Sequence, residues 1–231
     1  MIKNPDLAVI IPVFNEAGKV GGMLDVLLQV DIIREIIVVD DGSTDQSLDE
    51  IKGAALADSR ITLIAHPVNQ GKGQAIYSGW HATKAQNLLL LDGDLFGMEP
   101  QHVLDLVQPI LEDRADMSIG QFQKGDWKTD FSHRVTPWLS GQRCLRANML
   151  GLISSQAAQG YGIETALTVA ARHYQWRCVR VPLVGMWHLP GESRRGFWLG
   201  FKTRFRMYVQ IVSAWHQAGG LHRVGSKIRV R

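Results

Sequence analysis

The chain has 231 residues, of which 45% are apolar and 20% charged, and its formal net charge is +3. This length and composition are typical of a globular protein with a sizeable core and exclude a fibrous or largely disordered chain. The first residues, Met1 to Pro5, lack the basic and apolar segments of a signal peptide. The sequence also contains no run of about 18 apolar residues, the length that could cross a bilayer. We therefore expect a cytoplasmic protein.

The small net charge hides a division along the chain. Residues 1–192 carry all 22 acidic side chains and 16 Lys or Arg, a net charge of −6. Residues 193–231 carry nine Lys or Arg and no acidic residue. The sequence therefore predicts a main domain over residues 1–192, followed by a basic helix and tail over residues 193–231.

Short apolar runs alternate with helix-like segments over the first hundred residues. The runs cover residues 7–13, 35–40, 61–66 and 87–92, and the helix-like segments cover about 16–29, 44–56 and 72–85. Strands separated by helices of this length pair in parallel, with right-handed crossovers. The sequence predicts a doubly wound, mostly parallel α/β sheet flanked by helices, in which ligands bind at the carboxyl ends of the strands.

Three of the four predicted strands end in polar residues, which lie within residues 12–16, 40–45 and 92–94. Taken singly, each group has an ordinary structural explanation: Ser43 or Thr44 can cap a helix, and a turn can form at Asp41-Gly42. Because the carboxyl ends of parallel strands meet at one edge of a sheet, the three groups together indicate a ligand site.

The residue types at this edge suggest a metal ion and a diphosphate. Asp92 and Asp94 present the hard oxygen ligands that Mg²⁺ and Mn²⁺ prefer, and such ions complete their coordination with substrate phosphates. In residues 69–75, NQGKGQA, two glycines allow the backbone to approach a ligand, and Lys72 offers a point charge for phosphate. The spacing is not that of a P-loop, and no GxGxxG follows the first strand.

The chain contains, in this order, the motifs IIPVFNE, VVDDGSTD, NQGKGQA and LLLLDGD. In order and spacing they resemble the motifs of the family 2 glycosyltransferases, which have the Rossmann-like GT-A fold. The resemblance is dense over about residues 7–100, and SGQR (140–143) and GYGIE (160–164) are similar to acceptor-side segments of the family. The pattern is similar to the dolichol-phosphate mannosyltransferase-like and glucosyl-phosphoglycerate synthase-like members.

This resemblance implies a metal-dependent transfer of a hexose from a nucleoside diphosphate sugar, with UDP-glucose the favoured donor. The acceptor would be anionic or lipid-linked, for instance a polyprenyl phosphate, a glycerolipid or a small phosphorylated acid. The nucleotide half would cover about residues 1–98 and the acceptor half about residues 99–192. Members usually invert the anomeric configuration, but some relatives with a late histidine retain it, so the stereochemical course stays open.

Two alternative functions stay open. The same fold could serve as a non-catalytic nucleotide-sugar sensor or a membrane-surface adaptor. A phosphatase with an Asp-x-Asp nucleophile is disfavoured, because its aspartate pair ends the first strand, whereas Asp92 and Asp94 follow the fourth.

The resemblance also implies roles for individual donor-side residues. Asp41 matches the residue that contacts a uracil or guanine ring. Asp94 would be the more direct metal ligand, with Asp92 nearer the ribose and His188, after a predicted strand over residues 177–184, completing the shell of Mg²⁺ or Mn²⁺. A buried hydrogen-bonding histidine is the alternative for His188. The implied nucleotide-sugar site comprises Pro12, Asn15, Glu16, Asp41, Lys72, Asp92, Arg194 and Arg195.

Glu164 and Asp94 are the predicted catalytic residues. Glu164 begins a predicted helix over residues 164–174 and is a candidate general base toward an acceptor hydroxyl. A glutamate favoured by the helix dipole is the alternative, and an anionic phosphate acceptor would need no base. Gln142 and Arg143 are predicted at the head of a helix, after a loop over residues 122–136, where they could bind an anionic acceptor or serve only the helix.

Near the C-terminus, six apolar residues recur at spacings of three and four: Phe197, Phe201, Phe205, Tyr208, Val212 and Trp215. They form one stripe of an amphipathic helix, which either packs on the domain or lies on anionic lipid. Each basic group near such a membrane contributes about 1 kcal/mol. The second interpretation predicts peripheral contact of residues 195–231 with the inner face of the plasma membrane.

No nucleic-acid-binding module accompanies this basic charge, so nucleic acid is not expected as a partner. The oligomeric state is unknown.

Overall fold

The computed structural model describes residues 6–123, 140–154 and 162–188. These residues belong to one compact unit that spans Met1–His188. The predictions for Arg194, Arg195 and the basic helix and tail over residues 193–231 lie outside the described residues, as do the predicted boundary near residue 192 and most of the predicted loop over 122–136. Within the described ranges, no helix is both long and apolar enough to cross a membrane.

The first half of the unit alternates strands and helices as the sequence predicts. Its elements are β1 (Leu7–Val13), α1 (Val20–Leu28), β2 (Glu35–Asp40), α2 (Ser47–Ala57), β3 (Ile61–Ala65), α3 (Lys72–Ala82) and β4 (Asn87–Leu90). Helix α1 begins at Val20 rather than near residue 16, because the intervening backbone forms a loop that is hydrogen-bonded to side chains from residues 43–50.

The second half is less regular. It contains β5 (Leu95–Phe96), α4 (Pro100–Leu111), β6 (Met117–Gln123), β7 (Arg143–Arg146), the 3₁₀ helix η2 (Ala147–Leu152), α7 (Ile163–His173), β8 (Cys178–Val184) and β9 (Trp187–His188). The predicted helix over residues 164–174 and the predicted strand over 177–184 correspond to α7 and β8.

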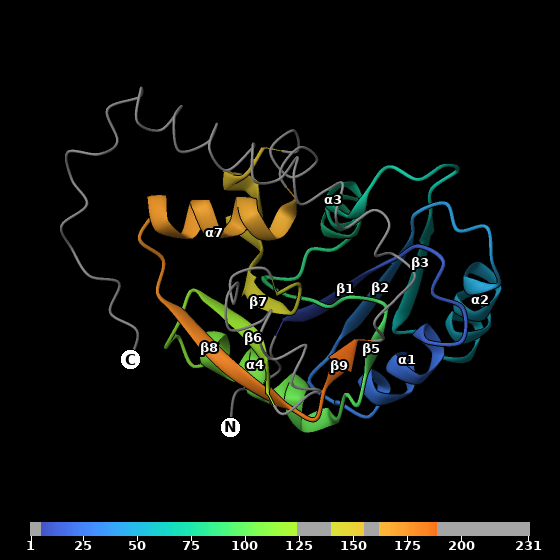
Figure 1. The fold of residues 1–231 in the computed structure, drawn as a ribbon, viewed down its shortest axis with the longest axis horizontal. Helices are drawn as coiled ribbons and strands as arrows, with labels where there is room; N and C mark the ends of the chain where they lie inside the picture. Colours follow the sequence, from blue (N-terminus) through green and yellow to red (C-terminus); the bar gives the residue numbers. More distant parts are fainter. Residues whose placement is uncertain (1–5, 124–139, 155–161, 189–231) are drawn as a thin grey trace. The chain divides into compact units, whose positions relative to one another are not determined.

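The strands form a seven-stranded sheet in the order β3-β2-β1-β4-β7-β6-β8, and β5 pairs with β9 in a separate ribbon (Figure 1). Only β7 is antiparallel to its neighbours, so the sheet is mostly parallel, as predicted. Strands β1 and β4 are neighbours although two strands separate them in sequence. The winding of the sheet reverses between them, and ligands in such sheets bind at this position.

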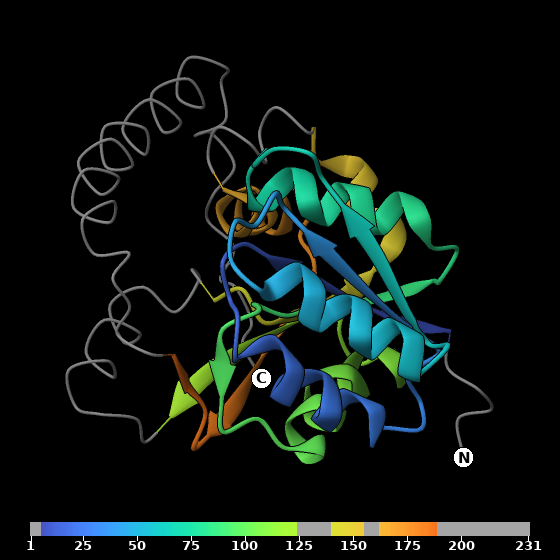
Figure 2. The same ribbon diagram turned by 90° about the vertical axis from the view of Figure 1, so that its right-hand side faces the viewer.

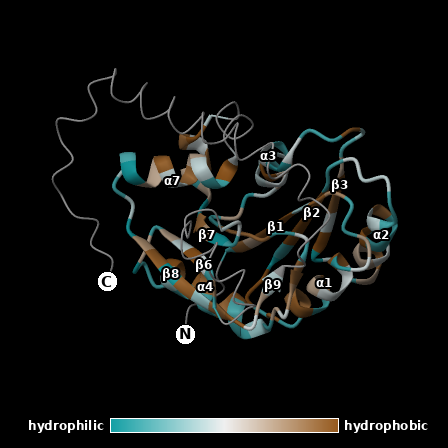
Figure 3. Cartoon of the chain, viewed as in Figure 1, coloured by the Kyte–Doolittle hydropathy of each residue, from teal (hydrophilic) through white to brown (hydrophobic). Residues whose placement is uncertain are grey.

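Helices cover both faces of the sheet (Figure 2). Residues of α1, α2 and α4 pack with Val9 and Ile11 on one face, and residues of α3, η2 and α7 pack with Ala8 and Ile10 on the other. Because successive side chains of a strand point to opposite faces, burial on both sides requires continuous apolar runs rather than alternation. The central strands are accordingly coloured as hydrophobic along most of their length (Figure 3).

One prediction about local structure is wrong. Gln142 and Arg143 do not lie at the head of a helix, because Arg143 begins strand β7. This strand lies between β4 and β6 in the sheet, and its first three residues are buried. A four-residue run that is buried on both faces has no periodicity that distinguishes a strand from a helix.

The packing of α3 on β1 gives a testable prediction. A Cβ added at Gly79 would lie 2.6 Å from Cγ2 of Ile10, which is fully buried, whereas nothing lies within 4 Å of a Cβ added at Gly53 of α2. We expect Gly79→Ala to lower the free energy of unfolding by about 1–3 kcal/mol through overpacking. Gly53→Ala should raise it by about 0.5–1 kcal/mol through helix propensity. Urea unfolding measures both, and stabilisation by both substitutions would contradict close packing of α3 on β1.

Candidate functional site

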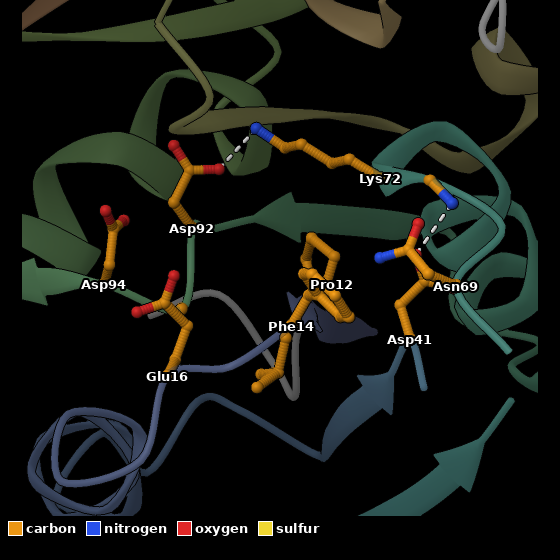
Figure 4. Close-up of a pocket in the computed structure, with 11 residues that line it drawn as sticks. Pro12, Phe14, Glu16, Asp41, Asn69, Lys72, Asp92 and Asp94 are labelled. Atoms are coloured by element: carbon orange, nitrogen blue, oxygen red, sulfur yellow. Dashed lines mark hydrogen bonds and ion pairs between the residues drawn. The ribbon is translucent and has the colours of Figure 1, made fainter. Parts of the chain in front are cut away.

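A pocket of about 450 Å³ lies at the switch point of the sheet (Figure 4). It is lined by Pro12, Val13, Phe14, Glu16, Asp41, Asn69, Gly71, Lys72, Asp92, Gly93 and Asp94. These residues come from the carboxyl ends of the four parallel strands β1, β2, β3 and β4 or from the segments that follow them. The structure therefore brings together six of the predicted site residues: Pro12, Glu16, Asp41, Lys72, Asp92 and Asp94.

Asp41 lies at one end of this pocket and is held by three donors. Its carboxylate accepts hydrogen bonds from the backbone N–H groups of Gln70, at 3.0 Å, and Gly71, at 2.7 Å, and its Oδ1 lies 2.7 Å from Nδ1 of His66. Gly71 has φ +91°, a conformation that residues with a Cβ rarely adopt. The glycine before α3 thus allows the β3–α3 loop to wrap around the carboxylate of Asp41, whose side chain is only 4% exposed.

Three carboxylates, Glu16, Asp92 and Asp94, lie at the other end of the pocket (Figure 4). Burial raises the pKa of Glu16 and the nearby charge of Asp94 raises it further, while an ion pair with Lys19 at 2.5 Å opposes both effects. Carboxylates that disfavour each other's charge in a half-buried pocket are stabilised by a cation between them. Their hard oxygens fit Mg²⁺ or Mn²⁺.

The full ligand set of such an ion is not assembled among the described side chains, where no group of three or more His, Cys, Asp or Glu is placed to hold a metal. The backbone of His188 lies in β9 and pairs with Leu95, the residue that follows Asp94. The side chain of His188 lies outside the described part of the structure, and its role as a metal ligand stays a prediction.

Lys72 connects the pocket with helix α7. Its Nζ forms ion pairs with both Asp92 and Glu164, and Gln142 donates a hydrogen bond of 3.0 Å to the second oxygen of Asp92. Burial alone would lower the pKa of Lys72, but the charges of Asp92 and Glu164 outweigh it and raise that pKa, so Lys72 stays cationic. A Cβ at Gly141 would lie 2.7 Å from the carboxyl carbon of Asp92, so this position favours glycine.

Arg143 lies beneath the site rather than in the pocket lining. It is fully buried, its Nε donates to the carbonyl of Ser140 at 2.8 Å, and its Nη2 donates to Oγ1 of Thr168 in α7 at 3.2 Å. Burial lowers the pKa of Arg143 to about 10, against the opposing charge of Glu164. Arg143 thus anchors α7 to β7, and its contact with an acceptor stays a prediction.

The loop between β1 and α1 is held by the segment VVDDGSTD and the first turn of α2. Four consecutive backbone N–H groups donate to side chains there: Asn15 to Ser43 at 3.0 Å, Glu16 to Ser47 at 2.8 Å, Ala17 to Asp45 at 3.1 Å and Gly18 to Glu50 at 2.8 Å. Asn15 has φ +57°, and its side chain accepts the N–H of Thr44 at 2.8 Å. Asn15 therefore shapes the loop that carries Glu16, and it is not among the residues that line the pocket.

The sequence did not indicate Phe14 or His66 as site residues. Phe14 lines the pocket although it is 44% exposed, and His66 contacts Asp41. The available signal was position alone, because both residues directly follow a strand whose carboxyl end reaches the pocket.

Ser47 offers a test of how the loop is held. It is fully buried and accepts the N–H of Glu16, so Ser47→Ala leaves that donor without its partner. We expect Ser47→Ala to lower the free energy of unfolding by about 1–3 kcal/mol. Ser43→Ala removes the equivalent bond to Asn15 at an exposed position and should change the free energy of unfolding by no more than about 0.5 kcal/mol. Guanidinium unfolding compares the two, and equal losses would contradict this difference in burial.

The mostly parallel sheet, with an acidic pocket at its switch point, defines a protein of the GT-A class. The profile described as Glycosyl transferase family 2 matches residues 8–164, which is more than half of the chain. The chain belongs to this family of enzymes.

Several characterised proteins are similar to this chain. Glucosyl-3-phosphoglycerate synthase of Mycolicibacterium paratuberculosis is 28% identical over 71% of this chain and 59% of its own length, and that of Mycolicibacterium smegmatis is 31% identical over 71% and 63%. The chain thus spans about three fifths of the length of these relatives. The crystal structure of the Mycobacterium tuberculosis synthase with Mn²⁺, UDP-glucose and phosphoglyceric acid has a TM-score of 0.65 at 23% identity, covering 82% of this chain and 73% of that one.

Proposed function

We propose that this family 2 glycosyltransferase moves a glucosyl group from UDP-glucose, with Mg²⁺ or Mn²⁺, to an anionic acceptor. The observation that carries the proposal is a pocket with two chemically different ends: Asp41 at one, and Glu16, Asp92, Asp94 and Lys72 at the other. Its volume of about 450 Å³ lies in the range of small-molecule sites. The similarity to glucosyl-3-phosphoglycerate synthases supports the choice of sugar.

The two ends suit the two parts of a nucleoside diphosphate. At the first end, a buried carboxylate accepts hydrogen bonds, so Asp41 suits the N–H group of a base. Pro12 and Phe14 lie between the ends and offer apolar surface to the base or ribose (Figure 4). At the second end, Asp94 and Glu16 would hold the divalent ion, with Asp92 beside them. When bound, such an ion neutralises the charge that develops on a leaving diphosphate.

In this proposal Glu164 would lie at the border between the donor and acceptor sides. It lies in the first turn of α7 and shares Lys72 with Asp92, so its carboxylate is close to the metal-binding end of the pocket. We assign to Glu164 the role of general base toward an acceptor hydroxyl. Lys72 orients this carboxylate and keeps a positive charge near the diphosphate.

The preferred acceptor is a small phosphorylated acid such as 3-phosphoglycerate, because two relatives that align over most of the chain are named for it. A lipid phosphate is the second acceptor class. A dolichyl-phosphate beta-glucosyltransferase of Trichomonas vaginalis is 33% identical, over 38% of this chain and 30% of its own length. Membrane contact through residues 195–231 would suit such an acceptor, and it is supported only by the apolar stripe and the basic charge of that segment.

Release of UDP from UDP-glucose tests the function. With Mn²⁺ we expect release to depend on 3-phosphoglycerate and to exceed release with a polyprenyl phosphate, and EDTA should abolish it. Asp94→Asn should lower kcat/KM at least about 100-fold and weaken UDP binding in the presence of Mn²⁺, because a metal-ligand oxygen is lost.

The outcomes separate the candidate functions. Calorimetry that finds Mn²⁺-dependent UDP binding by Asp94→Asn as tight as that of the unsubstituted protein would refute the metal site. Tight UDP binding by the unsubstituted protein without turnover of any acceptor would instead favour a nucleotide-sugar sensor.

Glu164→Gln tests the general base. We expect kcat with a hydroxyl acceptor to fall by about 10²- to 10⁴-fold, because a neutral amide cannot accept the proton. UDP affinity should stay near its original value, since Glu164 does not line the donor pocket. Glu112→Gln, at the C-terminal end of α4, is the matched control and should leave kcat unchanged. Steady-state kinetics with saturating UDP-glucose would disprove the base role if Glu164→Gln retained its kcat.

A further inference from the structure

Asp41 belongs to a chain of buried and partly buried polar side chains that the metal and diphosphate chemistry does not explain. Nδ1 of His66, directly after β3, lies 2.7 Å from Oδ1 of Asp41, and its Nε2 lies 2.9 Å from Oγ of Ser78 in α3. The side chains of His66 and Asp41 are 8% and 4% exposed. The contacts connect β2, β3 and α3 directly behind one end of the donor pocket.

The partners determine which ring nitrogen of His66 carries the proton. An ionised carboxylate only accepts hydrogen bonds, so Nδ1 must donate to Asp41. In a neutral ring, Nε2 then accepts the hydroxyl proton of Ser78. Asp41 therefore fixes the tautomer, Ser78 as the second partner fixes the plane of the imidazole ring, and the imidazole in turn fixes Oδ1 of Asp41.

Counting acceptor sites shows what remains for a ligand. A carboxylate offers about four lone-pair sites. Oδ1 of Asp41 is used by His66 and by the N–H of Gln70, and Oδ2 is used by the N–H of Gly71. Contacts within the described ranges therefore leave one acceptor site on Oδ2, and Asp41 lines the pocket. The carboxylate can accept one further hydrogen bond, in a fixed direction.

We propose that His66, itself held by Ser78, is a positioning residue that aims the last acceptor site of Asp41 at an N–H group of the nucleobase. The proposal rests on the proposed function, because it takes the pocket to bind a nucleoside diphosphate. A site that can only accept favours uracil or guanine, whose ring nitrogens carry a proton, over cytosine or adenine, whose corresponding nitrogens are acceptors. His66 thereby contributes to base selectivity without contacting the base.

Base selectivity distinguishes this role from a structural one. Replacing a histidine that only supports the fold would weaken the binding of all nucleotides alike. Replacing a histidine that orients Asp41 would weaken the binding of UDP and leave the binding of CDP nearly unchanged. The reason is that CDP has no N–H at the ring position that would donate to Asp41.

Calorimetric titration of the full chain with UDP and with CDP, each with Mn²⁺, tests the proposal. For His66→Leu we expect the UDP affinity to fall about 10- to 100-fold, because the N–H of uracil loses its well-aligned hydrogen bond to the charged carboxylate of Asp41. The CDP affinity should change less than about threefold. His66→Asn places an amide N–H near the position of Nδ1 and should recover most of the UDP preference. Ser78→Ala should lower the UDP preference about two- to tenfold, because the ring loses its second partner.

Equal losses of UDP and CDP affinity in His66→Leu, or an unchanged UDP preference, would overturn the proposal. If His66→Leu does not fold, as judged by circular dichroism, Ser78→Ala decides, and an unaltered UDP preference in that variant overturns the proposal. An unsubstituted protein that binds neither nucleotide overturns the proposed function as well. An unsubstituted protein that turns over UDP-glucose, with variants that keep its UDP preference, overturns only the role of His66.

Discussion

The pairing of β1 with β4 at the centre of the sheet is the constraint on which the site depends. Their register places Ile10 opposite Leu90, and the N–H of Leu91 continues the ladder to the carbonyl of Ile10 at 3.2 Å. The residues that follow each strand therefore emerge side by side. A Cβ on Gly93 would lie 3.2 Å from the carbonyl oxygen of Pro12, which leaves little room for any other residue between the two aspartates. The glycine of the DGD motif is thus explained by the packing of the two strand ends, and its flanking carboxylates reach the same pocket as Glu16.

The positive charge of Lys72 partly compensates the carboxylates that this topology brings together. Asp92 and Glu164 both form ion pairs with it, while Lys19 pairs with Glu16. Like charges in a half-buried site raise one another's free energy unless cations lie among them. The raised pKa of Glu16 indicates that its ion pair with Lys19 does not fully offset burial and the nearby charge of Asp94. An acidic pocket is well suited to an anionic diphosphate only if a divalent cation accompanies it, which links the metal requirement directly to the folded geometry.

Much of the fold follows from patterns that burial imposes on the sequence. Strands β1 and β2 are buried on both faces, so their apolar runs show their bounds directly. The start of α1 could not be predicted, because the loop before it depends on side chains such as Ser47, which lies some thirty residues away. The strand that begins at Arg143 could not be predicted, because a charged residue in a central strand contradicts the usual pattern. The polar ends of the strands could be found by topology alone, whereas the contact of His66 with Asp41 depends on the direction of two side chains, which the sequence does not encode in any local pattern.

The position of Glu164 shows how the sheet, rather than a loop, sets the geometry between the two halves of the site. Its carboxylate is held by Lys72 at the start of α3, and its backbone carbonyl accepts the hydroxyl of Thr168 at 2.8 Å. Thr168 in turn accepts a hydrogen bond from Arg143 in β7, the strand beside β4. The first turn of α7 is therefore attached on one side to the donor pocket and on the other to the centre of the sheet. A general base needs its carboxylate within hydrogen-bonding reach of the acceptor hydroxyl, and two partly buried attachments to rigid elements restrict its movement far more than a single loop contact would. The buried arginine thus fixes the helix that carries the proposed base.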